Sequence, residues 1–193
     1  YLSNGRYAPN GDYEGFAPEH DPGWRTRLSV TTSTNDGWDW STPRPIDVPE
    51  VRGGSPFGKV VIGTDGRTLM SVYVSVNQPN EGIRSRSWII ASTDGGATWE
   101  DPRPIHDGMN ETALTVLPDG DILAVMRSET GAALYAARSG DGGASWSAPQ
   151  QLTQPGQHPG DLVALSDGSL LLAYGNRNAP YRIEGLVSRD GGR

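Results

Sequence analysis

Short apolar runs alternate with turn-forming clusters along most of the chain. Residues 60–62, 114–117 and 162–165 are such runs, and each is followed closely by an Asp-Gly pair. Runs of this length, with no helical periodicity between them, are typical of β-strands joined by tight turns. The pattern therefore predicts an all-β fold built from many short strands.

The Asp-Gly pairs predict hairpin turns that recur along the chain. In Pro118-Asp119-Gly120, proline favours the first central position of a type I turn and glycine the left-handed position that follows it. Asp65-Gly66 and Asp167-Gly168 repeat the signal, and residues 2–6 resemble a fourth copy. Each turn is expected to close a hairpin.

A second signal, an Asp box of the type Ser-x-Asp-x-Gly-x-Thr-Trp, alternates with these turns. It occupies residues 92–99 and 139–146, with a looser copy at 33–40 and a copy at 188–193 that stops before its expected tryptophan. The serines lie 59, 47 and 49 residues apart, so one unit is about 50 residues long. Each unit reads strand, turn, strand, loop, strand, box, strand, which predicts a four-stranded propeller blade.

The boxes are interpreted as structural elements. Asp94 and Asp141 are expected to accept hydrogen bonds from turn amides, while Trp99 and Trp146 wedge into the blade. An alternative is metal binding in the looser box at 35–39, but its residues lack the ligand set of a calcium loop. We therefore expect no metal.

The boxes resemble those of the sialidase (neuraminidase) superfamily, over nearly the whole chain from about Leu2 to Arg193. The resemblance is sharpened by Asn110-Glu111-Thr112-Ala113-Leu114, which leads through the 117–120 turn to Met126-Arg127-Ser128. It implies a six-bladed β-propeller, of which this chain would form about four blades. It also implies a retaining exo-glycosidase acting on terminal sialic acid or a related acidic sugar, without a cofactor.

In this resemblance Glu111 is the base that activates a tyrosine nucleophile, and Arg127 belongs to a triad of arginines that binds the sugar carboxylate. Asn110 lies beside the base as a further candidate for substrate binding. A three-residue turn at 118–120 would also place Glu111 directly opposite Arg127 in the hairpin. The alternative is a cross-strand ion pair without function, which contributes little to stability when exposed.

Two residues compete for a second triad position, Arg177 and Arg182. Arg182 lies six residues before a box serine, as do Arg27 and Arg86, so it could instead be a structural arginine shared by blades. His158 begins the inner strand of the next blade, from which it could bond a glycan hydroxyl or be held by the backbone. These alternatives are open from the sequence.

The composition of the chain limits the classes of molecule that it is expected to bind. Sixteen Lys and Arg against 23 Asp and Glu give a net charge of -7, and no basic run interleaves with aromatic residues, so nucleic acid is a poor partner. No apolar stretch approaches the length that spans a bilayer. The chain has no cysteine, which excludes disulfides and thiol chemistry. The expected partner is a sialylated or other acidic glycan.

We expect residues 1–193 to be a partial sialidase-like propeller domain truncated at both ends. An upstream arginine, an upstream acid/base aspartate and a downstream tyrosine, which the resemblance implies, are not identifiable here. The resemblance also suggests secretion or a periplasmic location. Competing functions are a non-catalytic propeller that binds glycans or protein partners, and a different glycoside hydrolase or a lyase on the same scaffold.

Overall fold

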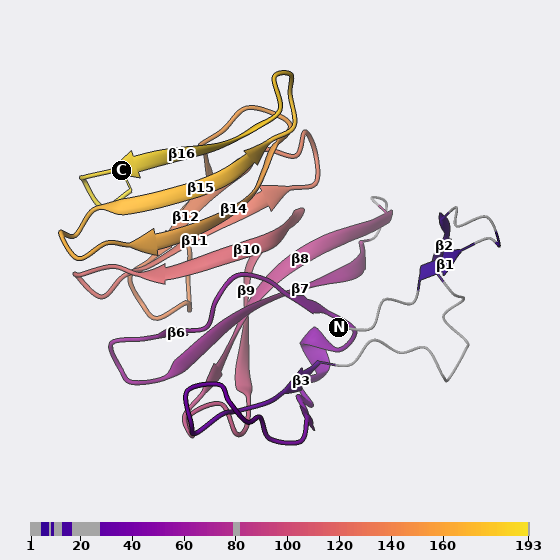
Figure 1. Ribbon diagram of the computed structural model, residues 1–193, viewed down its shortest axis with the longest axis vertical. Coiled ribbons are helices and arrows are strands. Elements are labelled where there is room, and N and C mark those ends of the chain that lie inside the picture. Colours follow the sequence, from indigo (N-terminus) through magenta and orange to yellow (C-terminus); the bar gives the residue numbers. More distant parts are fainter. Residues whose placement is uncertain (1–4, 8, 10–12, 17–27, 79–81, 193) are drawn as a thin grey trace.

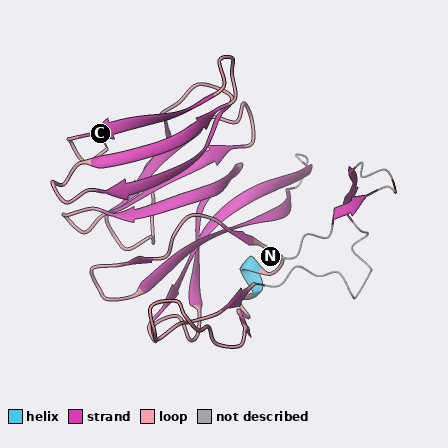
Figure 2. Ribbon diagram, viewed as in Figure 1, coloured by secondary structure: helices cyan, strands magenta, loops and turns pink. Residues whose placement is uncertain are grey.

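The computed structural model describes residues 5–7, 9, 13–16, 28–78 and 82–192. Within these residues the structure is built from β-strands, with one short 3-10 helix, η1 (Pro49–Val51). Figures 1 and 2 show antiparallel sheets lying side by side, as predicted for successive blades. A small hairpin of β1 (Gly5–Tyr7) and β2 (Tyr13–Phe16) lies away from these sheets.

The first two blades come from the N-terminal half of the chain. The first blade contains β3 (Ser29–Val30) and β4 (Arg44–Pro45). The second blade has an inner edge made of two short strands that both pair with β7. Its strands are β5 (Ser55–Pro56), β6 (Val61–Ile62), β7 (Thr68–Gln78), β8 (Gly82–Ser92) and β9 (Glu100–Asp107).

The third and fourth blades carry the candidate site. The third blade pairs its four strands in chain order: β10 (Met109–Val116), β11 (Ile122–Ser128), β12 (Leu134–Ser139) and β13 (Gln150–Gln151). The fourth blade contains β14 (Gln157–Ala164), β15 (Leu170–Asn176) and β16 (Arg182–Ser188). The sheets form an open arc of sialidase propeller type, consistent with the predicted incomplete ring.

The predicted hairpin turns are confirmed in the second, third and fourth blades. At the 117–121 turn, Leu117 N donates to Asp121 O at 2.8 Å and Gly120 N donates to Leu117 O at 2.9 Å. Gly120 has a φ of 93°, the left-handed conformation that a glycine adopts without steric cost. Corresponding bonds close the turns at Gly63–Arg67 and Leu165–Ser169. Most of the fourth predicted turn, at 2–6, lies outside the described residues.

The Asp boxes act as structural turns. Asp141 accepts hydrogen bonds from Ser139 Oγ, Ser145 N and Ser145 Oγ, and Asp94 accepts the equivalent bonds in the second blade. Ser145 is the main cause that lowers the pKa of Asp141 to about 2. In the looser box Asn35 takes the place of the aspartate and accepts a bond from Asp39 N at 2.9 Å.

Apolar side chains fill the spaces between neighbouring blades. Trp146 packs against the cluster between the second and third blades, which includes Leu69, Ile89 and Met126. Leu134, Leu162, Leu172 and other residues pack between the third and fourth blades. The inner strands also meet, since β10 contacts both β7 and β14. This packing fixes the position of the β10 and β14 ends relative to each other.

Candidate functional site

A β-bulge near the start of β10 changes the predicted pairing of Glu111. Pairing follows the prediction from Val116 back to Ala113, which lies opposite Val125. The register then shifts by one residue, so that Asn110, and not Glu111, lies opposite Arg127. The prediction that Glu111 is directly opposite Arg127 was therefore wrong, because an extra residue is accommodated in β10.

The bulge places Glu111 in a left-handed backbone conformation, with a φ of 41°. Such a conformation is uncommon for a residue with a side chain. Thr112, the next residue, is anchored to the second blade: its carbonyl accepts a bond from Ser71 Oγ at 2.5 Å, and its Oγ1 lies 2.6 Å from Ser87 Oγ. Contacts between blades thus hold the bulge and aim Glu111.

The side chains of Glu111 and Arg127 still meet. Arg127 Nη1 lies 3.4 Å from Glu111 Oε1, and the two side chains are 29% and 23% exposed. Glu111 Oε2 and Arg127 Nε are both buried, and neither has a hydrogen-bond partner among the described residues. A buried polar atom without a partner is costly, so these two atoms are suited to a ligand that supplies a donor and an acceptor.

The fourth blade contributes His158 and Arg177 to the same region. His158 lies within the corresponding bulge of β14, and its side chain is buried with Nδ1 unpartnered. Arg177 follows β15, is exposed, and donates from Nε to the His158 carbonyl at 3.3 Å. The sequence did not predict this hydrogen bond between the Arg177 side chain and the His158 carbonyl.

The pKa of His158 is lowered by its surroundings. Burial lowers this pKa below 6.5, the positive charges of Arg127 and Arg177 lower it further, and the charge of Glu111 raises it. His158 is therefore neutral at neutral pH. The site then holds two guanidinium cations against one carboxylate, a balance that favours an anionic ligand.

Arg182 lies in a different environment. Its Nε forms an ion pair with Glu184 Oε1, and its side chain is 53% exposed. Arg86, six residues before its own box serine, likewise pairs with Asp107. Arg27 lies outside the described residues. Arg177 thus forms a hydrogen bond with His158, whereas Arg182 forms an ion pair with Glu184.

Asn110 lies beside the bulge, opposite Arg127, and faces the second blade. Its Nδ2 donates to Ser85 Oγ at 3.4 Å, while its Oδ1 is buried without a partner. Glu129, just after β11, accepts a bond from Ser85 N at 2.8 Å. The backbone of Asn110 therefore lies next to Glu111 and opposite Arg127. Its side-chain NH2 group contacts the second blade.

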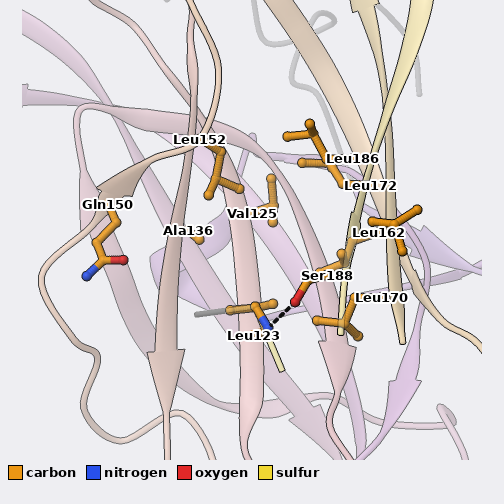
Figure 3. Close-up of a pocket in the computed structure, with 12 residues that line it drawn as sticks. Leu123, Val125, Ala136, Gln150, Leu152, Leu162, Leu170, Leu172, Leu186 and Ser188 are labelled. Atoms are coloured by element: carbon orange, nitrogen blue, oxygen red, sulfur yellow. Dashed lines mark hydrogen bonds between the residues drawn. The ribbon is translucent and has the colours of Figure 1, made fainter. Parts of the chain in front are cut away.

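An apolar pocket of about 150 Å³ lies between the third and fourth blades (Figure 3). Leu123, Val125 and Leu152 line it from the third blade, and Leu162, Leu172 and Leu186 from the fourth. No charged side chain lines it. The pocket lacks groups for acid-base chemistry, so we place the candidate site at Glu111 and Arg127.

The described part of the chain holds neither a candidate metal cluster nor a membrane-spanning helix. No group of three or more His, Asp or Glu side chains there is arranged to hold a metal ion. None of the described helices has the length and apolar character needed to span a membrane.

The fold defines a class, the β-propeller with Asp-box repeats, here as an open arc of blades. The profile of the BNR repeat-like domain family matches residues 17–193, nearly the whole chain. The chain belongs to the BNR repeat-like domain family.

Similar proteins include carbohydrate-active enzymes. A xyloglucanase from Paenibacillus sp is 31% identical in an alignment 179 residues long; the match covers 79% of this chain and 16% of the xyloglucanase. A protein of unknown function from Dyadobacter fermentans superposes with a TM-score of 0.73 and 24% identity, over 95% of this chain and 50% of that one. A variant of the NanB sialidase from Streptococcus pneumoniae superposes with a TM-score of 0.65 and 21% identity, over 83% and 26% of the two chains.

The chain spans about one sixth of the xyloglucanase and half or less of the two solved structures. The structural similarities therefore establish the fold.

Sequence reasoning missed the polar network around Glu184. This carboxylate accepts hydrogen bonds from Gln157, Tyr174 and Asn176 in addition to Arg182. One signal was available: Arg182 and Glu184 are two residues apart in a strand, so they lie on the same face and can contact each other. The contacts across three strands depend on register, which the sequence did not supply.

Proposed function

We propose that this protein is a glycan-active glycoside hydrolase, and that its substrate is a terminal acidic sugar of the sialic acid type. The observation that carries the proposal is the juxtaposition of Glu111 and Arg127, with buried atoms of both side chains left without partners. The xyloglucanase and sialidase among the similar proteins support glycan processing in general.

Arg127 and Arg177 are proposed to bind the carboxylate of the sugar. A planar guanidinium can donate two parallel hydrogen bonds to a carboxylate, which a lysine ammonium cannot do. Arg177 is preferred to Arg182 because its charge acts on His158 together with that of Arg127, whereas Arg182 is paired with Glu184. Arg177 is exposed, and the partly buried Arg127 lies closer to Glu111.

Glu111 is proposed to act as the base. Within the described part of the chain its Oε2 has no hydrogen-bond partner, so it can accept a proton from the hydroxyl of a nucleophile. In the sialidase-type mechanism this nucleophile is a tyrosine: its oxygen bonds to the anomeric carbon and its proton passes to the glutamate, while the glycosidic bond breaks and the released aglycone oxygen takes a proton from a separate acid. Two of the described tyrosines, Tyr135 and Tyr174, donate to Gln151 and Glu184, so neither of these two is offered to Glu111.

His158 and Asn110 complete the proposed binding region. A neutral imidazole with an unpartnered Nδ1 can donate to or accept from a sugar hydroxyl without adding charge. Asn110 contributes through the bulge that it begins, and its unpartnered Oδ1 is available to a donor.

The proposal is tested by comparing an acidic with a neutral substrate. The full-length protein is assayed on a fluorogenic α-sialoside and on neutral xyloglucan oligosaccharides, as wild type and as Arg127→Gln. We expect release from the acidic glycoside, with kcat/KM reduced at least 100-fold in Arg127→Gln. Cleavage of the neutral oligosaccharides alone, at equal rates in both proteins, would overturn the proposal.

A further inference from the structure

The carboxylate of Glu184 is the centre of a network that joins all three strands of the fourth blade. Its Oε1 accepts from Asn176 Nδ2 at 2.9 Å and from Arg182 Nε. Its Oε2 accepts from Gln157 Nε2 at 2.9 Å and from Tyr174 OH at 3.0 Å. The donors come from β14, β15 and β16, so one side chain ties the three strands together at the end where the candidate site lies.

Two of these donors directly precede the site residues of the fourth blade. Gln157 is followed by His158, and Asn176 is followed by Arg177. Gln157 and Asn176 are also paired across the sheet, at the outer limit of the bulge that contains His158. A group that holds this pair therefore fixes the backbone from which His158 and Arg177 extend.

Further bonds carry this constraint to Arg177. Asn176 Oδ1 accepts from Asn178 N at 2.9 Å, so the amide bound to Glu184 also fixes the turn after Arg177. Arg177 N donates to Gly156 O at 2.9 Å, and Arg177 Nε donates to the His158 carbonyl. The backbone of Arg177 is thus held from both sides.

The network is not a requirement of the blade repeat. Glu184 lies four residues before its box serine, and the equivalent positions in the second and third blades are Trp88 and Tyr135. Tyr135 donates to Gln151, which is a different arrangement. A carboxylate at this position is therefore particular to the blade that carries His158 and Arg177.

We propose that Glu184 is a positioning residue, which fixes the ends of β14 and β15 and thereby holds His158 and Arg177 in place to bind an anionic sugar. This inference rests on the proposed function. Glu184 acts through these neighbours and does not itself touch substrate.

The charge of Glu184 is essential to this role. Each of its oxygens accepts two hydrogen bonds, and the donor from Asn176 is the main cause that lowers the pKa of Glu184. In Glu184→Gln one carboxylate oxygen is replaced by an NH2 group, which cannot accept hydrogen bonds. Two of the four donors would therefore lose their acceptor. An aspartate would be one methylene too short to reach both strands.

The test uses Glu184→Gln in the full-length protein, with Glu100→Gln as a matched control on the exposed surface of β9. With the acidic glycoside as substrate, we expect Glu184→Gln to raise KM about tenfold, with kcat changed less than threefold. In an Arg177→Gln background, Glu184→Gln should raise KM less than it does in the wild type, because the contribution through Arg177 is already lost and only that through His158 remains. Multiplicative effects in the double variant would overturn the inference.

A second readout does not depend on turnover. The pKa of His158, followed by NMR, should rise in Glu184→Gln, because a displaced Arg177 no longer lowers it, and should be unchanged in Glu100→Gln. An unchanged His158 pKa in Glu184→Gln overturns the inference even if the wild type hydrolyses the acidic glycoside. If the wild type shows no turnover, the proposed function fails, and the His158 titration alone decides the role of Glu184.

Discussion

Glu111 contacts Arg127 although the two residues are not paired across their hairpin. Arg127 lies opposite Asn110, and the bulge at Glu111 turns its carboxylate to within 3.4 Å of Arg127 Nη1. The fourth blade repeats the bulge at His158, between the pairs Gln157–Asn176 and Gly160–Tyr174. Two neighbouring blades thus use the same irregularity to direct different side chains to one region.

Replacing Arg127 with lysine tests whether the planar guanidinium is needed. Lysine keeps the positive charge and loses the two-pronged donor geometry, so we expect KM for an acidic glycoside to rise about tenfold, equivalent to about 1.4 kcal/mol. Steady-state kinetics measure this change. An unchanged KM would show that Arg127 contributes charge alone.

The pKa of His158 should respond to its charged neighbours. Burial, Arg127 and Arg177 lower this pKa, while Glu111 raises it. An NMR titration should therefore show a higher pKa in Arg127→Gln and a lower one in Glu111→Gln. Unchanged pKa values in both variants would place His158 away from these groups.

The same pKa predicts how stability depends on pH. The folded protein favours neutral His158, so its contribution to stability is complete above pH 6.5 and declines as the pH falls towards the lower folded pKa. The thermal midpoint of the wild type should drop more between pH 7.5 and pH 5.5 than that of His158→Gln. Parallel curves for the two proteins would contradict this prediction.

The Asp boxes should stabilise the blades down to strongly acidic pH. The pKa of Asp141 is lowered from 3.8 to about 2, first by hydrogen bonds from Ser145, so its stabilising effect is present above 3.8 and is lost as the pH falls through 2. Asp141→Asn should lower the thermal midpoint at pH 6, and the difference from wild type should shrink towards pH 2. Asp36→Asn, on the exposed surface of the looser box, is the control. A constant difference across this range would assign the effect to something other than charge.

The contact between the third and fourth blades depends on Leu134. This side chain is fully buried, and its Cδ1 lies 2.6 Å from the point where a Cβ on Gly160 would be. Leu134→Ala should cost about 3 kcal/mol of unfolding free energy, whereas Leu186→Ala, at a partly exposed position, should cost less than about 1 kcal/mol. Urea denaturation measures both, and equal losses would contradict the packing described here.

The repeating architecture could be predicted because its signals are local. The turn at Pro118-Asp119-Gly120 and the box at Asp141 have the hydrogen bonds expected from their residue types. Register along β10 was also predicted correctly from Ala113 to Val116, because the turn length fixes it.

The site geometry could be predicted only in part, since it depends on contacts between blades. The bulge at Glu111 is held because the Thr112 carbonyl accepts a bond from Ser71 Oγ and its Oγ1 bonds with Ser87 Oγ, both in the second blade. The spacing of residues in β10 does not reveal these contacts. The choice between Arg177 and Arg182 was open for the same reason: the sequence did not show which strand ends face His158.

Kinetics of Glu111→Gln on an acidic glycoside test the central claim most directly. Glu50→Gln, an exposed residue of η1, serves as the matched control. We predict that kcat falls at least 100-fold in Glu111→Gln while the thermal midpoint is retained, as expected when a general base is removed. A kcat equal to that of the control would contradict the assignment of Glu111 and, with it, the proposed mechanism.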